Sequence, residues 1–474
     1  MNLKGWRLQL AINLLLLSSA TAQHLVLEGI TSIKVSYENP EDKVPVTAKI
    51  FHTFPSWEIS EITDTISTAR EEIWLSCPVR TSQEARIIID HRELPLMVIP
   101  GDTIYISLSG PPESPKVEFS GKAKHIQEYY MARATRFPIT VDQLIMNAGM
   151  TSSNLHAFQL QADSIYLLDQ EFWNGYNQRQ YLPDWFLRRE ADAIRYRNAY
   201  LRLYTLTYQT IVQEKDGEIP ANFFHFLKTT PIRNEAAMYD GYYLLFLREY
   251  LRHTARRGTA TLDQDKEFKL AKDLLGDKIG NFYILYSISS HLISNPGKVK
   301  SDLTKHTFAV PWKHLVDFLL GQSESYINKL SPGDKAPEFY LEDRLDSLIS
   351  LSQFKNHVVY LSFWFPGCKG CIREFPFEND LVETFQGKAV KIVNICTRAS
   401  KTNWIATVEK YKLKTLNLYA NSSWQNKLEE KYGIKVYPHY VLINGDGRVI
   451  ENFAPRPSQV SKHIEKALTE LNVK

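Results

Sequence analysis

Two cysteines three positions apart constrain this chain more than any other feature of its 474 residues. Cys368 and Cys371 follow an apolar run at 358–363 that is typical of a buried strand, and a helical pattern begins at the first of them. At this spacing both sulfurs can meet within one helical turn, so that a small disulfide ring can open and close. The pattern predicts a strand that turns into a helix at a dithiol pair.

The position of the first cysteine at a helix start bears on its reactivity. The sulfur of Cys368 would face free backbone N–H groups and the positive end of the helix dipole, both of which favour thiolate over thiol. Lys369 adds a positive charge beside it. Cys371 lies one turn further into the helix and is therefore more shielded. We predict that Cys368 attacks and that Cys371 suits the resolving role.

Two other interpretations of the cysteine pair stay open. A zinc site would need two further ligands, but Cys77 and Cys396 stand alone and no second C-x-x-C or H-x-x-x-H spacing occurs, so we expect no metal. A static structural disulfide suits an exported chain, although a strand-to-helix junction favours exchange chemistry. Buried, inert thiols are expected at Cys77 and Cys396, and a bridge between them would need contact between distant parts of the chain.

Several motifs around the cysteines recur in one known family. They are the entry segment 333–339 (GDKAPEF), the pair Phe363-Trp364, the continuation 374–376 (EFP), and Tyr437-Pro438 before a later strand. With these motifs, residues 331–474 resemble the thioredoxin fold, and in particular the TlpA/ResA-like group of exported thiol–disulfide oxidoreductases. The resemblance implies a C-terminal α/β thioredoxin fold with a cis-proline at Pro438.

The resemblance also implies roles for individual residues. Cys368 would attack a disulfide of a partner protein, and Cys371 would then release the reduced partner, so that the pair cycles as a redox-active disulfide. Glu374 would lie one turn past Cys371, where a half-buried carboxylate can raise thiol pKa values and carry a proton. Pro438 would present its backbone to an extended substrate. Trp364 would pack beneath the loop or contact the substrate.

The motifs depart from the family pattern at four places. Gly367 stands where the family usually has Trp, and the dipeptide between the cysteines is Lys369-Gly370 rather than a pair ending in Pro. Ser362 occupies the position of a buried Asp in thioredoxins proper, and His439 follows the cis-proline position where Thr is usual. The redox potential of the family therefore does not transfer to this chain.

The rest of the chain predicts a multidomain protein. Residues 23–120 contain short β-rich runs separated by Pro, Gly, Asn and Asp, which favour an antiparallel β-sandwich-like domain. Residues 121–330 change to a helical period and predict an all-α middle domain. The breaker cluster 331–337 marks the start of the third domain. This three-part layout resembles exported proteins of Bacteroidetes type.

One helical segment of the middle domain carries charges of both signs. Arg188, Arg195 and Arg202 recur at a seven-residue spacing, and Glu190 and Asp192 lie between them. An interleaved pattern of this kind is typical of a solvated helix face, and we expect that here rather than a docking surface for an acidic partner.

The first 22 residues predict a signal peptide. Lys4 and Arg7 precede an apolar run at 8–17, and Ala20-Thr-Ala22 fits a cleavage site. We therefore expect a periplasmic or otherwise exported protein that is soluble after cleavage. A formal net charge of +3 from 56 basic and 53 acidic residues is too balanced for a general nucleic-acid binder, so no nucleic-acid partner is expected.

These observations predict an exported thiol–disulfide oxidoreductase. Reduction of disulfide-containing exported proteins is favoured over oxidation, with electrons from a membrane thiol carrier, and no cofactor motif occurs. One alternative is a non-enzymatic protein that binds a partner or a glycan and carries a passive thioredoxin module. Another is a thiol peroxidase, but the segment before Cys368 lacks the P-x-x-x-T-x-x-C setting of that class.

Overall fold

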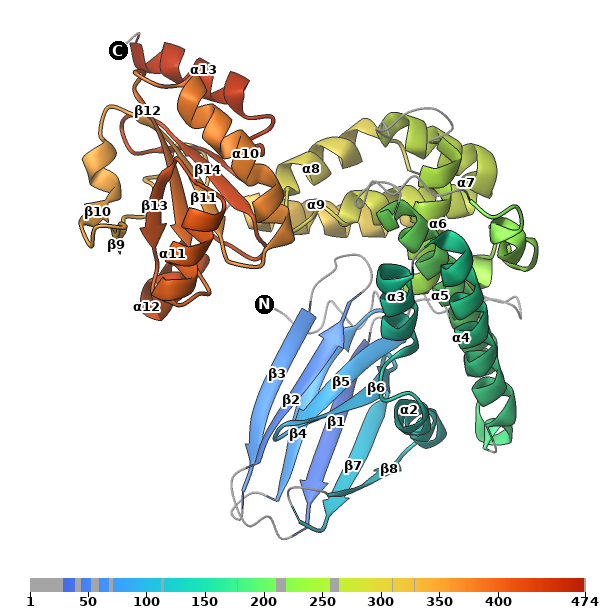
Figure 1. Ribbon diagram of the computed structural model, residues 1–474. Helices are drawn as coiled ribbons and strands as arrows, with labels where there is room; N and C mark the ends of the chain where they lie inside the picture. The colour runs from blue at the N-terminus through green and yellow to red at the C-terminus, as the bar shows by residue number, and fades with distance from the viewer. Residues whose placement is uncertain are drawn as a thin grey trace. The chain divides into compact units, whose positions relative to one another are not determined.

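The structure is a computed structural model whose described residues form two compact units, divided after Tyr286 (Figure 1). It describes residues 29–38, 44–52, 59–67, 71–111, 115–152, 154–176, 178–209, 219–255, 264–308, 310–327 and 329–472. The expected signal peptide at 1–22 lies outside these residues. The expected domain boundaries at 120/121 and 330/331 stay predictions.

Two four-stranded sheets open the first unit and share one hydrophobic core. Inward residues alternate with outward ones along each strand, as in the strand at 72–79, which explains how short half-apolar runs fold this way. The first sheet has the order β4 (Glu72–Val79), β1 (Gly29–Tyr37), β7 (Thr103–Ser109) and β8 (Lys116–Ser120), and the second has β3 (Ile59–Ile66), β2 (Val44–Phe51), β5 (Gln83–Ile89) and β6 (Arg92–Val98). This arrangement agrees broadly with the expected β-sandwich.

One strand pair differs from the expected antiparallel pattern. β1 pairs with β7 in parallel, with Lys34 opposite Tyr105, whereas every other pair in these two sheets that the structure describes is antiparallel. The chain passes through the second sheet as β5 and β6 before it returns as β7, so β7 enters beside β1 by a crossover rather than by a hairpin.

Helices follow the sheets, in broad agreement with a helical middle region. They are α2 (Lys124–Arg136), α3 (Val141–Thr151), α4 (Leu155–Gly175), α5 (Asp184–Thr207), α6 (Gly241–Ala255), α7 (Gln264–Ser289), α8 (Pro296–Lys305) and α9 (Lys313–Ile327). The pattern at 263–293 predicts one continuous helix, but Gly276 inside α7 has φ 77° and ψ 171°, which interrupts the helical backbone. None of the helices in the described ranges is long and apolar enough to cross a membrane.

The expected solvated face of α5 is wrong at two positions. Arg202 and Glu190 are buried, whereas Arg195 and Asp192 form a partly exposed ion pair at 2.7 Å. Glu190 accepts a hydrogen bond from the Tyr129 hydroxyl at 2.9 Å, so a second helix covers this side of α5. The charge pattern could not show that covering, because it arises from packing between helices far apart in the sequence.

The second unit contains a seven-stranded sheet with the order β10-β9-β13-β12-β11-β14-β15. Its strands are β9 (Tyr340–Glu342), β10 (Leu348–Ser350), β11 (Val358–Trp364), β12 (Val390–Cys396), β13 (Leu416–Tyr419), β14 (His439–Ile443) and β15 (Val449–Asn452). β11, β12 and β13 are parallel, and β14 and β15 are antiparallel to their neighbours. The mixed sheet matches the α/β pattern of the sequence, which did not indicate the short β9–β10 hairpin.

Helices cover both faces of this sheet (Figure 1). α10 (Lys369–Thr384) and α13 (Ser461–Asn472) pack on the face of Val358 and Tyr360. α12 (Ser422–Lys431) packs on the face of Leu361 and Phe363, and α11 (Lys401–Lys410) contributes to a cluster at the end of β11. Every residue of β11 is buried, which is expected for a central strand covered on both faces.

Candidate functional site

A disulfide joins Cys368 and Cys371 where β11 gives way to α10. Their Cα atoms are 5.3 Å apart, a spacing that one helical turn supplies. Cys368 exposes 7% of its surface and Cys371 only 2%, so an approaching group reaches Cys368 first. The structure thus places the pair at the strand-to-helix junction that the sequence predicts.

Cys368 is the N-cap residue of α10. Its Sγ accepts a hydrogen bond from the backbone N–H of Cys371 at 3.2 Å. The sulfur therefore lies next to the backbone N–H groups of the first helical turn. Partial positive charge at this end of a helix stabilises an anion. When the disulfide opens, these groups favour the thiolate at Cys368, while the exposed Lys369 leaves its charge in solvent beside it.

A hydrophobic cluster supports the disulfide from below. Trp364 is fully buried in it and lies edge-on to Phe375 of α10, with ring centroids 5.1 Å apart. Both cysteines belong to the same cluster, together with Trp404 of α11. The position of Trp364 beneath the loop fits a packing role and leaves no exposed ring surface for a substrate.

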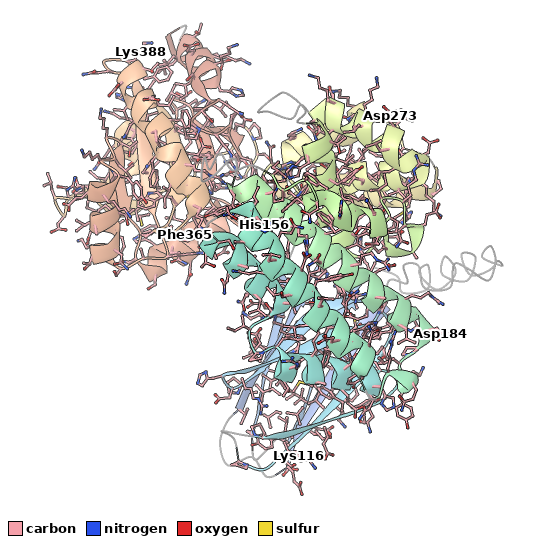
Figure 2. The ribbon with its side chains drawn as sticks, turned by 45° about the vertical axis from the view of Figure 1, so that its right-hand side comes forward. Lys116, His156, Asp184, Asp273, Phe365 and Lys388 are labelled. Carbon is pink, nitrogen blue, oxygen red and sulfur yellow. A yellow bond between two sulfur atoms is a disulfide. The ribbon has the colours of Figure 1, made fainter. Side chains whose placement is uncertain are left out.

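A proline from another part of the sheet closes the site. The Tyr437-Pro438 peptide bond is cis, and Cδ of Pro438 lies 3.3 Å from the position that a Cβ on Gly370 would occupy. Glycine between the cysteines therefore lets the proline come close. Beside it, the ring of Phe365, labelled in Figure 2, meets the Tyr437 ring edge-on at 5.4 Å.

Comparison with known proteins places these residues in a family. The Redoxin family model matches residues 331–468. The thiol-disulfide oxidoreductase ResA of Bacillus thuringiensis subsp. konkukian is 29% identical over 143 residues, which are 30% of this chain and 80% of that protein. ResA of Geobacillus thermodenitrificans is 30% identical over 135 residues, 28% of this chain and 76% of that protein. The chain belongs to the ResA family of thiol-disulfide oxidoreductases.

A solved structure was also matched. The thioredoxin domain of a thiol-disulfide oxidoreductase from Bacteroides vulgatus is 25% identical, with 29% of this chain and 99% of that chain covered and a TM-score of 0.28. The ResA-family match lies in the C-terminal part of the chain, where the resemblance was expected. The expected family and enzyme class, a thioredoxin-fold thiol–disulfide oxidoreductase, are confirmed.

Gly367 gives this ResA-family site a loop that other residues would strain. Its φ of 88° lies in the left-handed region, directly before Cys368, where the family usually has Trp. We expect Gly367→Ala to lower the free energy of unfolding of the oxidised protein by about 1–2 kcal/mol, because a Cβ is disfavoured at this φ. Chemical denaturation followed by hydrogen exchange of α10 measures the effect.

The matched control for this substitution is Gly321→Ala in α9 of the same unit. Gly321 has an ordinary helical backbone and open space where a Cβ would lie, so alanine is expected to be neutral or to stabilise by up to about 1 kcal/mol. Equal losses of stability in the two variants would contradict the role of the backbone angle at Gly367.

Glu374 is buried on α10, one turn past Cys371. Its Oε1 accepts a hydrogen bond from Nη1 of Arg456 at 3.2 Å, and its Oε2 accepts one from the Ser458 hydroxyl at 3.2 Å. Both partners belong to the segment between β15 and α13. The carboxylate is therefore held by a positive charge, and its expected role as a proton carrier stays a prediction.

Glu378 is a second buried carboxyl group that the sequence did not single out. It exposes 1% of its surface, and burial raises its pKa to about 7. Ser362 of β11 donates to its Oε1 at 2.7 Å, and Nδ2 of Asn394 on β12 donates to its Oε2 at 2.6 Å. The spacing of seven residues from Cys371 on one helix was the signal that could have found it.

His439 follows the cis-proline and is also buried. Burial lowers its pKa to about 4, and the hydrogen bond to Asn452 opposes that shift only in part. Its Nε2 lies 2.9 Å from Oδ1 of Asn452, which as an acceptor assigns the ring proton to Nε2. The ring is therefore neutral at physiological pH and acts as a structural donor.

The two remaining cysteines are free and buried, as expected. Burial raises the thiol pKa of Cys77 in the first unit and that of Cys396 in the second, which keeps both protonated and unreactive. Cys396 lies opposite Trp364 in the strand register and belongs to the cluster beneath the site. No cluster of possible metal ligands occurs within the part of the chain that the structure describes.

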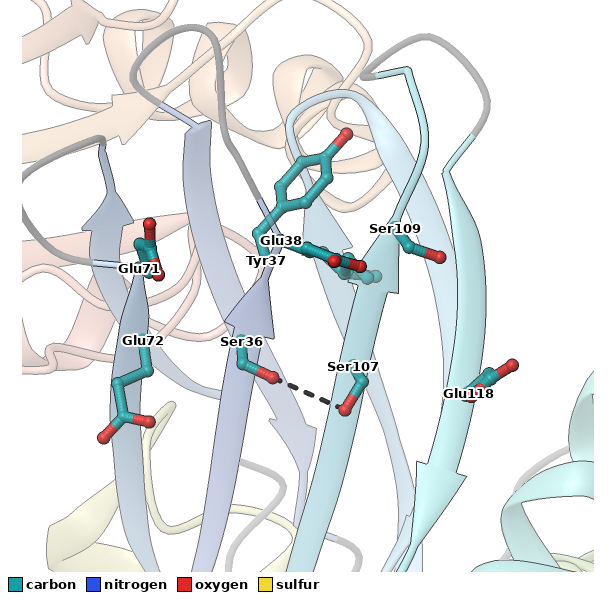
Figure 3. A pocket seen from close by; sticks show the side chains of 9 residues that line it. Ser36, Tyr37, Glu38, Glu71, Glu72, Ser107, Ser109 and Glu118 are labelled. Atoms are coloured by element: carbon teal, nitrogen blue, oxygen red, sulfur yellow. Dashed lines mark hydrogen bonds between the residues drawn. The ribbon is translucent and has the colours of Figure 1, made fainter.

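The first unit has a hollow of its own, at one end of the β4-β1-β7-β8 sheet (Figure 3). Its volume is about 560 Å³, and its polar lining consists of Ser36, Tyr37, Glu38, Glu71, Glu72, Ser107, Ser109 and Glu118. Two of its acids are paired, Glu72 with Lys34 at 2.7 Å and Glu118 with Lys116 at 2.6 Å. These ion pairs reduce the negative charge of the hollow.

Proposed function

We propose that this protein is an exported enzyme that reduces disulfides of partner proteins through Cys368 and Cys371. One observation carries the proposal: a disulfide whose outer sulfur caps a helix and whose inner sulfur is almost fully buried. Such an asymmetric pair has one sulfur that a protein substrate can reach and one that acts only within the enzyme.

The cycle uses the two sulfurs in turn. In the reduced enzyme, the Cys368 thiolate attacks a partner disulfide, forms a mixed disulfide and expels one partner sulfur as a thiolate. Cys371 loses its proton and attacks Sγ of Cys368, which restores the internal disulfide and releases the second partner sulfur. The partner gains two electrons and the enzyme loses two. Backbone amide groups at the start of α10 stabilise the Cys368 thiolate of the reduced enzyme before a substrate binds.

Regeneration of the dithiol needs an external electron donor. A membrane thiol carrier that passes two electrons by the same exchange chemistry would serve, since another dithiol can reduce the Cys368–Cys371 bond without any further group. The basic and apolar pattern of residues 1–22 supports export to the periplasm, where such a carrier and disulfide-containing substrates would both be met.

Replacement of Cys371 by serine tests this function directly. The variant is expected to accumulate mixed disulfides through Cys368, because the step that releases the partner needs the second sulfur. The variant is expressed in the native host, and adducts are identified by non-reducing electrophoresis and mass spectrometry. Cys396→Ser is the control and should trap nothing, since it keeps Cys371 for the releasing step and loses only a buried thiol. A wild-type disulfide that resists dithiothreitol, together with no adduct in Cys371→Ser, would exclude the redox function.

A further inference from the structure

Three side chains lie along one buried face of α10. Cys371, Glu374 and Glu378 follow each other at spacings of three and four residues, which places them on the same side of the helix. All three are buried, and about 10 Å of helix axis separates the first from the last. The disulfide and the two carboxyl groups therefore lie along one buried side of α10.

The two carboxyl groups have different partners. Glu374 is bound by the guanidinium of Arg456, a positively charged group that can only donate hydrogen bonds. Glu378 is bound by neutral groups, the hydroxyl of Ser362 and the amide of Asn394, and no ion pair joins it to a basic residue in the described ranges. Glu374 therefore contacts a positively charged side chain, whereas Glu378 contacts only neutral donors.

The neighbours of Glu378 can form hydrogen bonds with both the ionised and the protonated form of its carboxyl group. The Ser362 hydroxyl donates to a carboxylate but can turn to accept from a carboxylic acid. Asn394 donates through Nδ2, while its buried Oδ1 has no hydrogen-bond partner, so a rotated amide would offer an acceptor. A proton can therefore enter or leave at Glu378 without leaving this carboxyl group unsatisfied.

The groups that face Glu378 from neighbouring elements add little positive charge. Glu374 on its own helix raises its pKa, in addition to the larger effect of burial. Tyr360 of β11 and Tyr440 of β14 are buried phenols whose own pKa values are raised well beyond the physiological range, so both are neutral. The side chain of Arg456 is 52% exposed and is already paired with Glu374.

We propose that Glu378, rather than Glu374, is the carboxyl group whose protonation is linked to reduction of the Cys368–Cys371 disulfide. The proposal rests on the proposed redox function. In the linked step a dithiol donor becomes a disulfide and gives two electrons to the Sγ–Sγ bond, which breaks. Of the donor's two protons, one goes to the Cys371 sulfur and one to the Glu378 carboxylate. Cys368 is released from the disulfide as a thiolate while the Glu378 carboxylate is neutralised, so the net charge of the site does not change.

Glu378 is a positioning residue in this step, because its charge acts on the two sulfurs from further along the buried side of α10. The Cys368 thiolate forms at the start of the same helix, and an ionised Glu378 would disfavour it, since buried like charges are poorly screened. Protonation of Glu378 removes one of the two negative charges, and the reduced enzyme keeps the attacking thiolate at the helix N-terminus.

The test is the pH dependence of the redox equilibrium of the full chain with dithiothreitol. The reduced fraction is measured by thiol alkylation and mass spectrometry from pH 5.5 to 9. For the wild type, the equilibrium constant plotted against pH is expected to change slope near pH 7. Glu378→Gln should abolish that change of slope. Glu378→Asp should retain a change of slope, and Glu374→Gln should leave the wild-type change of slope in place. Loss of the change in Glu374→Gln, or its persistence in Glu378→Gln, would overturn the proposal.

A second variant keeps the test decisive if Glu378→Gln does not fold. Ser362→Ala removes the hydroxyl that favours the carboxylate, so the change in slope is expected to move to higher pH. An unmoved profile would contradict the proposal. A failure of the proposed function looks different: the wild-type disulfide would not be reduced by dithiothreitol at any pH, and Cys371→Ser would trap no partner.

Discussion

Replacement of Cys368 by serine is expected to lower the rate of protein disulfide reduction by about 10³-fold or more. The serine hydroxyl is not ionised at neutral pH, and loss of the nucleophile removes the first covalent step rather than weakening it. The amide groups at the start of α10 remain, but they stabilise an anion that no longer forms. Insulin reduction by the full chain, with dithiothreitol as electron donor and turbidity as readout, measures the change.

Two other substitutions provide the control for this result. Cys77→Ser and Cys396→Ser remove free buried thiols and should keep the rate of insulin reduction within about twofold of the wild type, because neither sulfur is accessible. If Cys368→Ser retained most of the activity while Cys396→Ser lost it, the attacking sulfur would be Cys396 and the assignment of the site would be wrong.

A loss of stability of about 3 kcal/mol is expected from His439 as the pH falls from 6.5 to 4. The pKa of His439 is lowered from 6.5 to about 4 in the folded protein, so between these values the unfolded chain binds more protons. The stability contribution of the neutral ring is complete above pH 6.5 and is lost as the pH falls through this window. At about 1.4 kcal/mol for each pKa unit, the shift corresponds to the stated loss.

The difference between the wild type and His439→Gln isolates this contribution. Glu378 acts in the opposite direction, since its raised pKa makes the folded state bind more protons between pH 4.5 and 7, and subtraction of the two profiles cancels it. Denaturant unfolding at several pH values, followed by hydrogen-exchange mass spectrometry of β11 and β14, gives both profiles. Parallel profiles between pH 4 and 6.5 would show that His439 does not titrate as its burial requires.

The sequence predicted those parts of the site that depend on local order along the chain. A buried strand, two cysteines and a helix start are consecutive, so the position of Cys368 as a helix cap followed from the pattern at 358–371. The cis-proline before β14 came from the family resemblance rather than from the residues themselves. Helix and strand positions in the C-terminal unit followed for the same local reason, because its elements alternate in short regular segments.

The parts that were missed depend on residues brought together by the fold. Glu378 looks like an ordinary charge on a helix, and only the register that sets Ser362 beside Asn394 shows that both partners of its carboxyl group lie beneath it. The same holds for Arg202 and Glu190. Their charge pattern predicts a solvated face, but neighbouring helices cover both residues in the fold. The parallel pairing of β1 with β7 likewise results from the crossover, and the sequence of neither strand indicates it.

The parallel pairing of β1 with β7 limits the order in which the strands of the first sheet can pair during synthesis. β1 is the first described strand, yet it lies between β4 and β7 in its sheet, and the second of these partners follows about seventy positions later. A chain that emerges from the ribosome or crosses a membrane N-terminus first must therefore carry β1 with one open edge until residues 103–109 arrive. During that interval the exposed edge is open to wrong pairing, and a helper that binds extended chain would act at this stage.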